Sequence, residues 1–360
     1  MKKDKAIIQI LTSPDGGGAE FLGREIAKKL KRLNYNSYII YFSNPNNIKL
    51  FEWEILLGKY NPRDLRNFFL LRRRLNCLRS KYSKLILHSH LTWPLFFTAI
   101  LSNRNTIKIY TEHNTHNKRR NFYIFKFLER FIYRRYDFIV CISKSTKIEL
   151  ERWLEYPLKN NISKVIYNGS RKFKYSYKVN KYKNKLRIIS IGSLTFQKGF
   201  DISIKAVNLC RNIIEQYNIY GEGKERKKLE NLIKELKLTN IVKIHGFENE
   251  IDKKDLNSNL ALIPSRWEGF GLVAVEILSA GIPIIANNVN GLNEVLNNCS
   301  AAFLINELNE ESLSKKIYFY YSRLDSFESL PNKAINHSLS FAFEKMFNEY
   351  EEIYNYFAEK

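Results

Sequence analysis

Residues 264–283 read PSRWEGFGLVAVEILSAGIP, and this stretch decides the fold of its half of the chain. The short apolar run 260–263 precedes it and predicts a buried strand. A glycine turn follows at 269–271, and the apolar segment 272–279 then predicts a helix that a glycine and a proline end. Backbone N–H groups and the helix dipole face such a turn, so the stretch predicts an anion-binding site.

Two glutamates flank this turn. Glu268 comes before it, and Glu276 lies two turns into the helix. A ligand could therefore place a phosphate on the backbone amides and hydroxyl groups on the carboxylates. The alternative is an ordinary strand–helix unit with two solvated glutamates.

The composition bounds the class of protein. The chain has 360 residues and 44% hydrophobic residues, enough for two domains with real cores. Four cysteines stand far apart without a CxxC pair, which argues against a zinc or disulfide framework and indicates a reducing cytoplasm. No signal peptide and no transmembrane helix are expected, because no apolar run is long enough.

The charge is unevenly distributed. Residues 1–180 carry 36 Lys and Arg against 13 Asp and Glu, whereas residues 181–360 carry 23 of each class. The whole net charge of +23 therefore lies in the first half. This asymmetry favours an anionic partner for that half: a phospholipid surface, a lipid-linked pyrophosphate or a nucleic acid.

Both halves alternate strand-like and helix-like segments, which predicts two α/β domains with parallel sheets. The stretch 171–185 is the expected linker, and 341–357 is expected to be a helix. The expected strands are 6–11, 37–42, 85–88, 107–112 and 138–142 in the first half, and 187–191 and 260–263 in the second.

Several turns next to these strands carry residues suited to a ligand. Gly16, Gly17 and Gly18 form a turn that is neither a Walker A loop nor a GxGxxG fingerprint. Lys198, in GSLTFQKGF, is a point charge suited to phosphate. His113 ends a strand on the side where doubly wound sheets bind ligands. The remaining candidates are the turn Gly221–Gly223 and His90, for which a purely structural role is the favoured alternative.

Taken in order along the chain, these segments resemble the retaining nucleotide-sugar glycosyltransferases of family 4. The E-x7-E pair at 268–276, the GG-x-E turn at 17–20 and the histidine at 113 match this family. The segment 192–199 matches its G-R-L-x3-K-G motif, except that Ser193 stands where the family has arginine. A serine brings no charge.

The resemblance implies the GT-B fold, an α/β architecture of two Rossmann-like, doubly wound parallel-sheet domains facing a cleft. The expected domains are 1–168 for the acceptor and 169–338 for the nucleotide sugar. The tail 339–360 would form a helix that crosses back to the first domain.

The resemblance also implies roles for individual residues. Lys198 would stabilise the diphosphate, Glu276 would bind the ribose hydroxyls, and His113 would orient the sugar. The implied catalytic residues are His113, Lys198 and Glu268. The implied donor-binding residues are Gly17, Gly18, Ser193, Lys198, Gly221, Gly223, Glu268, Gly269, Phe270, Gly271 and Glu276.

The expected reaction is transfer of a sugar, with retention, to a saccharide or polyprenyl-linked saccharide in surface-polysaccharide synthesis of the lipopolysaccharide, O-antigen or capsule type. The donor would be a UDP or GDP sugar. No essential metal is expected, because the chain has no Asp-x-Asp pair. The alternatives are a catalytically impaired relative that acts as a binding module, which Ser193 favours, and a nucleic-acid-binding protein that uses the basic half.

Two basic segments with interleaved apolar residues, 63–84 and 118–136, could lie on an anionic membrane. Arg72, Arg73 and Arg74 of the first segment are the candidate contacts, and a solvated basic face is an equal alternative. For the second segment, an apolar stripe packed on its own core is the favoured interpretation. The expected location is the cytoplasm, peripherally on the inner face of the membrane.

Overall fold

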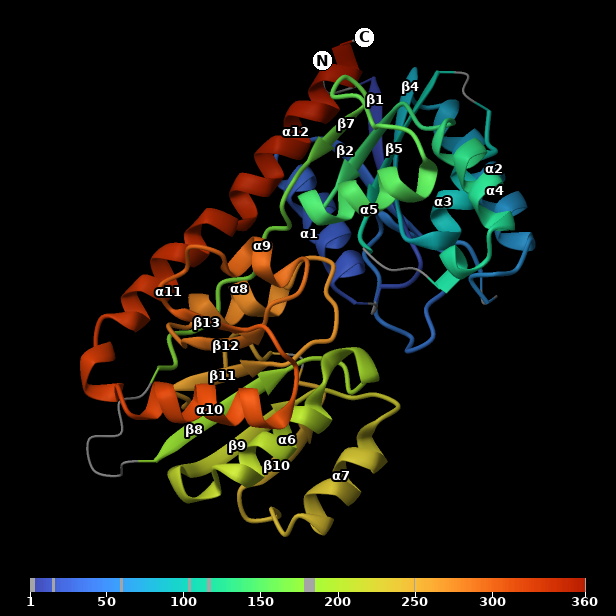
Figure 1. Cartoon of the computed structure of the whole chain (residues 1–360). Coiled ribbons are helices and arrows are strands. Elements are labelled where there is room, and N and C mark those ends of the chain that lie inside the picture. Colours follow the sequence, from blue (N-terminus) through green and yellow to red (C-terminus); the bar gives the residue numbers. More distant parts are fainter. Residues whose placement is uncertain are drawn as a thin grey trace. The chain divides into compact units, whose positions relative to one another are not determined.

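The structure is a computed structural model, and it describes residues 4–14, 17–58, 61–102, 105–114, 118–177, 185–248 and 250–359 (Figure 1). The chain divides into two compact units. The first unit comprises residues 1–168 and 346–360, and the second comprises 169–345. These divisions fall at 168 and 345, against the expected 168 and 338.

The first unit is built on a seven-stranded parallel sheet in the order β3-β2-β1-β4-β5-β6-β7. Each of the five expected strands in this half is present. Its elements are β1 (Lys5–Leu11), α1 (Gly18–Arg32), β2 (Asn36–Tyr41), β3 (Glu54–Leu56), α2 (Arg66–Arg79), β4 (Lys84–His90), α3 (Thr92–Ala99), β5 (Thr106–Glu112), η1 (Lys118–Asn121), α4 (Ile124–Tyr133), β6 (Phe138–Cys141), α5 (Lys144–Leu154) and β7 (Ser163–Val165).

Helices cover both faces of this sheet, which explains why its central strands are apolar almost throughout. On one face, Ala6, Ile8 and Ile10 of β1 pack in a cluster with the leucines of α2 and with Phe97 of α3. On the other face, Leu11 packs with Ala27 of α1. Successive residues of β1 therefore serve two separate cores.

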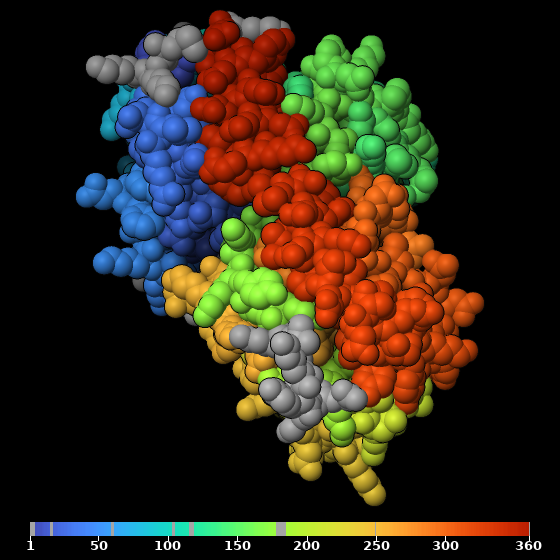
Figure 2. Space-filling model, turned by 90° about the vertical axis from the view of Figure 1, so that its left-hand side faces the viewer, coloured from blue at the N-terminus to red at the C-terminus, as the bar shows by residue number. Residues whose placement is uncertain are grey.

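The C-terminal helix α12 (Phe343–Glu359) lies on the α1 side of the first sheet. In Figure 2 its red residues lie between the blue N-terminal segment and the green segment near residue 160. The Tyr35 hydroxyl donates to Glu351 at 2.8 Å, and Lys164 pairs with Glu349 at 3.1 Å. The apolar side of α12 is buried, so the helix completes the first unit's core.

The second unit is built on a six-stranded parallel sheet in the order β10-β9-β8-β11-β12-β13. The strand 260–263 and the helix 272–279 begin and end where the sequence predicts. The elements are β8 (Leu186–Ile191), η2 (Phe196–Lys198), α6 (Phe200–Leu209), η3 (Arg211–Ile213), β9 (Ile214–Tyr220), α7 (Arg226–Glu235), β10 (Val242–Gly246), β11 (Leu260–Ile263), α8 (Leu272–Ser279), β12 (Ile284–Asn287), α9 (Leu292–Leu296), β13 (Ala302–Ile305), α10 (Glu310–Tyr321), η4 (Leu324–Phe327), α11 (Leu330–Ser338) and η5 (Leu339–Phe341).

The first part of the expected linker packs on the second unit. Phe173 is buried, and its backbone N–H donates to the Ser279 hydroxyl of α8 at 2.9 Å. The Ser176 N–H donates to the Ala280 carbonyl at 2.9 Å. Residues 171–177 are thus held against α8 rather than forming a free connection. The remainder of that stretch up to residue 184, like Gly16 of the first glycine turn, lies outside the described residues.

The two basic segments differ in the side chains that they bury. In α2 the apolar residues Leu71, Leu75 and Leu78 are buried, and Arg72, Arg73 and Arg74 form an exposed face. In α4, by contrast, two charged side chains point inward. The exposed apolar residues around α4, here termed the α4 apolar face, are Phe122, Tyr123, Ile124, Phe127, Leu128 and Phe131, which are 44–74% exposed.

The expectation that segment 118–136 packs its apolar stripe on its own core holds for Ile132, which is buried in a cluster with Tyr133 and Tyr136, and fails for Phe122 and Leu128, which are exposed. The inward-facing residues of α4 include Lys126 and Glu129 beside Ile132 and Tyr133. Burial of Glu129 is compensated, because Arg119 pairs with it at 2.9 Å and the Trp153 indole donates to it at 2.9 Å. Two charged side chains thus share the inner face of α4 with Ile132 and Tyr133. Among the described residues, no helix is long and apolar enough to cross a membrane.

Candidate functional site

The site in the second unit starts where β8 and β11 end side by side. Gly199 follows Lys198 with a φ of +65°, and a Cβ there would lie 2.0 Å from the backbone carbonyl oxygen of Pro264. Only glycine allows the two loops to approach this closely. The loop after β8 is thereby held against the loop after β11, which carries Ser265 and Glu268.

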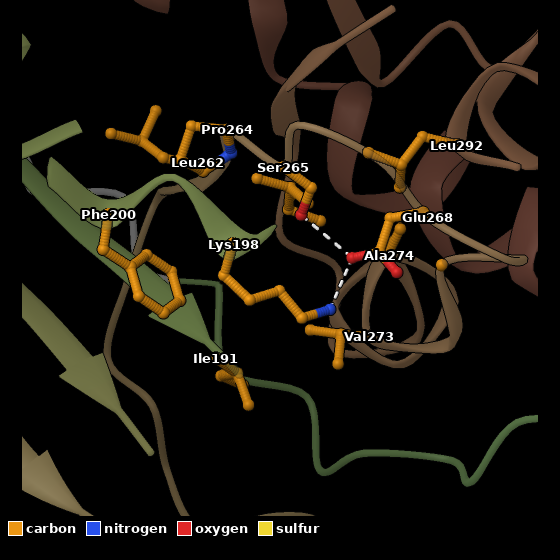
Figure 3. Close-up of a pocket in the computed structure, with 12 residues that line it drawn as sticks. Ile191, Lys198, Phe200, Leu262, Pro264, Ser265, Glu268, Val273, Ala274 and Leu292 are labelled. Carbon is orange, nitrogen blue, oxygen red and sulfur yellow. Dashed lines mark hydrogen bonds and ion pairs between the residues drawn. The ribbon is translucent and has the colours of Figure 1, made fainter. Parts of the chain in front are cut away.

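This close approach brings Lys198 and Glu268 together. The Lys198 ammonium forms an ion pair with Oε1 of Glu268, and the Ser265 hydroxyl donates to the same oxygen at 2.9 Å. Figure 3 shows both interactions converging on the Glu268 carboxylate. The second oxygen, Oε2, takes part in neither interaction. Both charged side chains are largely buried, so each depends on its partners for compensation.

A pocket surrounds this pair. It is lined by apolar residues on one side and by the loop after β11 and the start of α8 on the other (Figure 3). The lining residues are Ile191, Lys198, Phe200, Leu262, Ile263, Pro264, Ser265, Glu268, Gly271, Val273, Ala274 and Leu292. A cation, a carboxylate and a helix N-terminus thus share one apolar-walled pocket, and these are groups that suit a phosphate and hydroxyl groups as ligands.

The turn at the start of α8 has the conformation that its glycines allow. Gly271 is the N-cap residue of α8 and has a φ of +87°. Gly291 packs so closely that a Cβ there would lie 2.6 Å from the Glu268 carbonyl oxygen. Phe270 is buried and packs edge to face with Phe341, so its side chain anchors the turn in the core. Gly269 lies between Glu268 and Phe270 in this turn.

Glu276 lies in α8 and is buried next to a cation that the sequence did not single out. The Arg171 guanidinium donates to Oε1 of Glu276 at 2.8 Å. Burial raises the pKa of the Glu276 carboxyl, and Arg171 opposes that shift by favouring the charged form. The expected ribose-binding carboxylate is therefore already oriented by a residue from the start of the expected linker.

The glycine turn after β9 packs directly on the loop after β8. A Cβ at Gly221 would lie 1.9 Å from the Gly192 carbonyl oxygen, and one at Gly223 would lie 2.3 Å from the Leu194 carbonyl oxygen. Ser193, between these two contact points, is exposed. The structure thus brings Ser193, Gly221 and Gly223 to the same edge of the sheet as Lys198.

The other candidate residues belong to the first unit. Gly17 is the N-cap of α1, and Gly18 is its first residue. His113 directly follows β5 and is half-buried, and its ring lies next to that of the buried His90. Burial lowers the pKa of His113 to about 4, so this imidazole is neutral at pH 7.

Sequence reasoning missed three residues that position the second-unit site. Ser265 precedes Glu268 by three residues, a short-range signal that could have been read. Arg171 has no local signal, because its partner is more than one hundred positions away. Arg266 pairs with Asp201 at 2.7 Å and lies 3.8 Å from the Phe196 ring centre. The loop after β11 is thereby fastened to the segment after β8 on both sides of Lys198.

Among the residues that the structure describes, no group of three or more His, Cys, Asp or Glu side chains is arranged to hold a metal ion.

Two family models match the chain in succession. Residues 16–170 match the model described as Glycosyltransferase Family 4, and residues 172–335 match the one described as Glycosyl transferases group 1. Together the two matches span both units.

Individual relatives agree with these matches. The chain is 30% identical to an uncharacterized glycosyltransferase of Methanocaldococcus jannaschii over 269 residues, which cover 72% of each chain. It is 29% identical to an uncharacterized 41.2 kDa protein in the cps region of Klebsiella pneumoniae, over 76% of this chain and 80% of the relative. Among solved structures, Anabaena HepE in complex with UDP and glucose has the same fold, with a TM-score of 0.81, 20% identity and coverage of 97% and 99%.

Proposed function

The chain belongs to glycosyltransferase family 4, also described as glycosyl transferases group 1, and we propose that it transfers a sugar from a nucleotide sugar to a saccharide or lipid-linked saccharide acceptor. The observation that carries this proposal is the convergence of Lys198, Glu268 and the start of α8 on one pocket. The second unit would bind the donor, and the first would bind the acceptor.

Within this pocket each residue has a role that its surroundings support. Lys198 would leave Glu268 to bind the donor's diphosphate and offset the charge that develops as the sugar departs. Glu268, with Ser265 still donating to it, would accept hydrogen bonds from the sugar hydroxyls. The backbone of Gly269–Gly271 and the N-terminal end of α8 would add donors for an anion.

Glu276 would bind the ribose hydroxyls, with Arg171 keeping its carboxylate charged and oriented. Gly221 and Gly223 would line the base, and Ser193 would offer a hydroxyl to the diphosphate. From the first unit, Gly17 and Gly18 would close over the diphosphate, and His113 would orient the sugar.

We also propose that transfer retains the anomeric configuration. The bond between the sugar and the phosphate breaks, and a bond to the acceptor oxygen forms on the same face. The acceptor's proton passes to the departing phosphate oxygen. This route needs no covalent nucleophile, and it suits a Glu268 carboxylate that Ser265 and the sugar hydroxyls hold by hydrogen bonds. The proton NMR coupling of the product's anomeric proton tests it, and an inverted product would contradict it.

Donor binding provides the test of the whole proposal. Thermal unfolding would be followed with UDP-, GDP- and ADP-sugars, without added metal, for the wild type, Glu276→Ala and the exposed control Glu235→Ala. One nucleotide class should raise the melting temperature by a few degrees at about 100 times its Kd. The rise should vanish in Glu276→Ala and persist in Glu235→Ala. No rise with any donor in the folded wild type would contradict the proposal.

We propose a UDP or GDP sugar as the donor. UDP sugars are tested first because the solved HepE structure contains UDP and glucose. We propose that no metal is essential, with the diphosphate charge offset by Lys198, backbone amides and the α8 N-terminus. Initial rates with EDTA and with added Mg²⁺ or Mn²⁺ should agree within about twofold, and a rate that EDTA abolishes would contradict this.

For the acceptor side, an anionic lipid surface explains both the charge and the α4 apolar face. Six apolar side chains of this face are exposed, and Arg134 and Arg135 beside them are exposed as well. Apolar residues that insert between lipid headgroups, with arginines attracted to them, form a monotopic membrane contact. The enzyme would act there on a lipid-linked saccharide, in surface-polysaccharide synthesis at the inner face of the cytoplasmic membrane. The relative from a cps region motivates this acceptor class.

Co-sedimentation with vesicles tests the membrane contact. The double variant Phe127→Ser/Phe131→Ser should lose binding to phosphatidylglycerol vesicles, because both rings are about half exposed. The triple variant of Arg72, Arg73 and Arg74 to Gln changes side chains that are also exposed, so it serves as the comparison for the double variant. It should weaken vesicle binding mainly at low salt. Unchanged binding of both variants would contradict a membrane role, and salt-sensitive binding to RNA instead would favour the nucleic-acid alternative.

A further inference from the structure

Three histidines of the first unit form one hydrogen-bonded chain beneath α12. Sheet register places Gln9 of β1 beside His88 of β4. Nδ1 of His90 lies 2.9 Å from Nε2 of His113, and Nε2 of His90 lies 2.8 Å from Oε1 of Gln9. The amide nitrogen of Gln9 lies 2.9 Å from the Tyr354 hydroxyl, which is 2.6 Å from Nδ1 of His88.

The direction of each hydrogen bond follows from counting protons, starting at His88. Burial lowers the pKa of His88 to about 3, so the ring is neutral and carries a single N–H. It faces two hydroxyls, those of Tyr354 at 2.6 Å and Thr111 at 2.7 Å, and only one of them can donate to it. The phenol is the stronger acid and has the shorter contact. Tyr354 therefore donates to Nδ1, and Nε2–H of His88 donates to Thr111.

The Gln9 amide is oriented in agreement with this assignment, its nitrogen toward Tyr354 and its oxygen toward His90. The Tyr354 hydroxyl has one proton, and it donates that proton in the hydrogen bond to His88. The phenol oxygen therefore accepts a hydrogen bond from the amide nitrogen of Gln9. The carbonyl oxygen of Gln9 must then accept from Nε2–H of His90. Nδ1 of His90 is consequently unprotonated and accepts from Nε2–H of His113.

We propose that Tyr354 is a positioning residue that acts through Gln9 and His90 to hold His113 in the tautomer with its proton on Nε2. The remaining nitrogen, Nδ1, has no hydrogen-bond partner among the described residues and is an acceptor. It therefore suits a substrate hydroxyl and not a phosphate oxygen. Its use on a sugar rests on the proposed function, whereas the tautomer does not.

The C-terminal helix is suited to this role because it is part of the first unit's core. Tyr350 and Tyr354 lie one turn apart, both are buried, and both rings pack against that of His88. Only Tyr354 lies in the chain that leads to His113. Tyr350 contacts Thr111 at 3.1 Å, which is beyond the far end of that chain. Tyr350→Phe is therefore a matched control for Tyr354→Phe.

The tautomers are measured directly by ¹⁵N NMR of histidine-labelled full-length protein at pH 7.5. Protonated and unprotonated ring nitrogens resonate far apart, and His113 is assigned from the signals lost in His113→Asn. We expect the proton of His113 on Nε2 in the wild type. A proton on Nδ1 would overturn the proposal without any variant being needed.

The variants test the role of Tyr354. In Tyr354→Phe the two His113 nitrogen signals should move toward each other, because Gln9 loses its partner and both tautomers become populated. In Tyr350→Phe the two His113 signals should stay in place. A Tyr354→Phe spectrum that matches the wild type would overturn the proposal.

Kinetics give a second readout. The kcat of Tyr354→Phe should be about tenfold below that of Tyr350→Phe, at equal donor KM. Equal kcat values with the expected spectra would instead contradict the proposed place of His113 at the sugar.

Discussion

The pocket of the second unit and the layer beneath α12 in the first unit differ in their polar side chains. In the second unit, charged groups meet at the ends of β8 and β11, where Lys198 and Glu268 remain 18% and 10% exposed. In the first unit, the polar groups of β1, β4 and β5 that lie beneath α12 are uncharged and fully buried: Gln9, His88 and Thr111. The net charge of the two halves differs in the other direction. The half with these uncharged buried groups carries the whole basic excess of the chain.

This difference separates two kinds of site. A charged pair at a strand end can exchange partners with an incoming anion at little structural cost. A buried chain of neutral donors and acceptors cannot, because each unpaired group would cost about 1–3 kcal/mol. We infer that the second unit is suited to bind the charged donor, and that the first is suited to orient neutral hydroxyls.

The largest expected effect is on the charged pair. Lys198→Gln should lower the initial rate of transfer by about 10²–10³-fold, the effect typical of losing a transition-state donor. The fold should survive, because Ser265 still donates to Glu268. Lys205→Gln, a more exposed lysine in α6, is the control and should retain the rate. A loss below fivefold for Lys198→Gln would remove the charged pair from the mechanism.

The glycine turns of the two units should differ in what they tolerate. Gly199→Ala should destabilise the protein by at least about 2 kcal/mol, because its Cβ would meet the Pro264 carbonyl in a left-handed conformation. Gly17→Ala should cost less than about 1 kcal/mol, since among the described residues its Cβ would make only an ordinary contact, at 4.0 Å from a carboxylate oxygen of Glu20. Urea unfolding measures both. Equal costs would mean that the second unit's loops are not held by close packing.

Acid should destabilise the first unit before the second. Burial lowers the pKa of His88 to about 3 and that of His113 to about 4, while both return to about 6.5 on unfolding. The unfolded state therefore binds more protons below pH 6.5, and stability falls with pH by about 1.4 kcal/mol per unit for each such histidine. Hydrogen exchange at pH 7.5 and 5.5 should show protection lost first in β1, β4 and β5. Earlier loss of protection in β8 and β11 would contradict the prediction that the first unit is the more acid-sensitive one.

The smallest expected effect concerns Ser193, which stands where the family motif has an arginine. Ser193→Arg should raise kcat/KM by about fivefold, because an exposed arginine adds about 1 kcal/mol of stabilisation to the departing diphosphate. Ser193→Gln, long but neutral, should not. A Ser193→Arg variant that becomes active while the wild type only binds the donor would instead favour the impaired-relative alternative.

The sequence by itself predicted much of the second unit. The strand 260–263, the helix 272–279 and the close spacing of Glu268 to its glycine turn are local features, and local periodicity and turn chemistry determine them. The sequence also predicted two α/β domains with parallel sheets, because alternating strand and helix patterns have few other solutions.

Other features depended on contacts between distant residues. The inward charges of α4 were invisible in the sequence, because Glu129 finds its partners in Arg119 and Trp153 only after folding. The pairing of Arg171 with Glu276, and of Tyr354 with Gln9 and His88, spans one hundred to several hundred positions. Sequence patterns specify which face of an element is apolar. Only the packed structure decides which polar groups become neighbours, because burial leaves each of them to find its partner from another part of the chain.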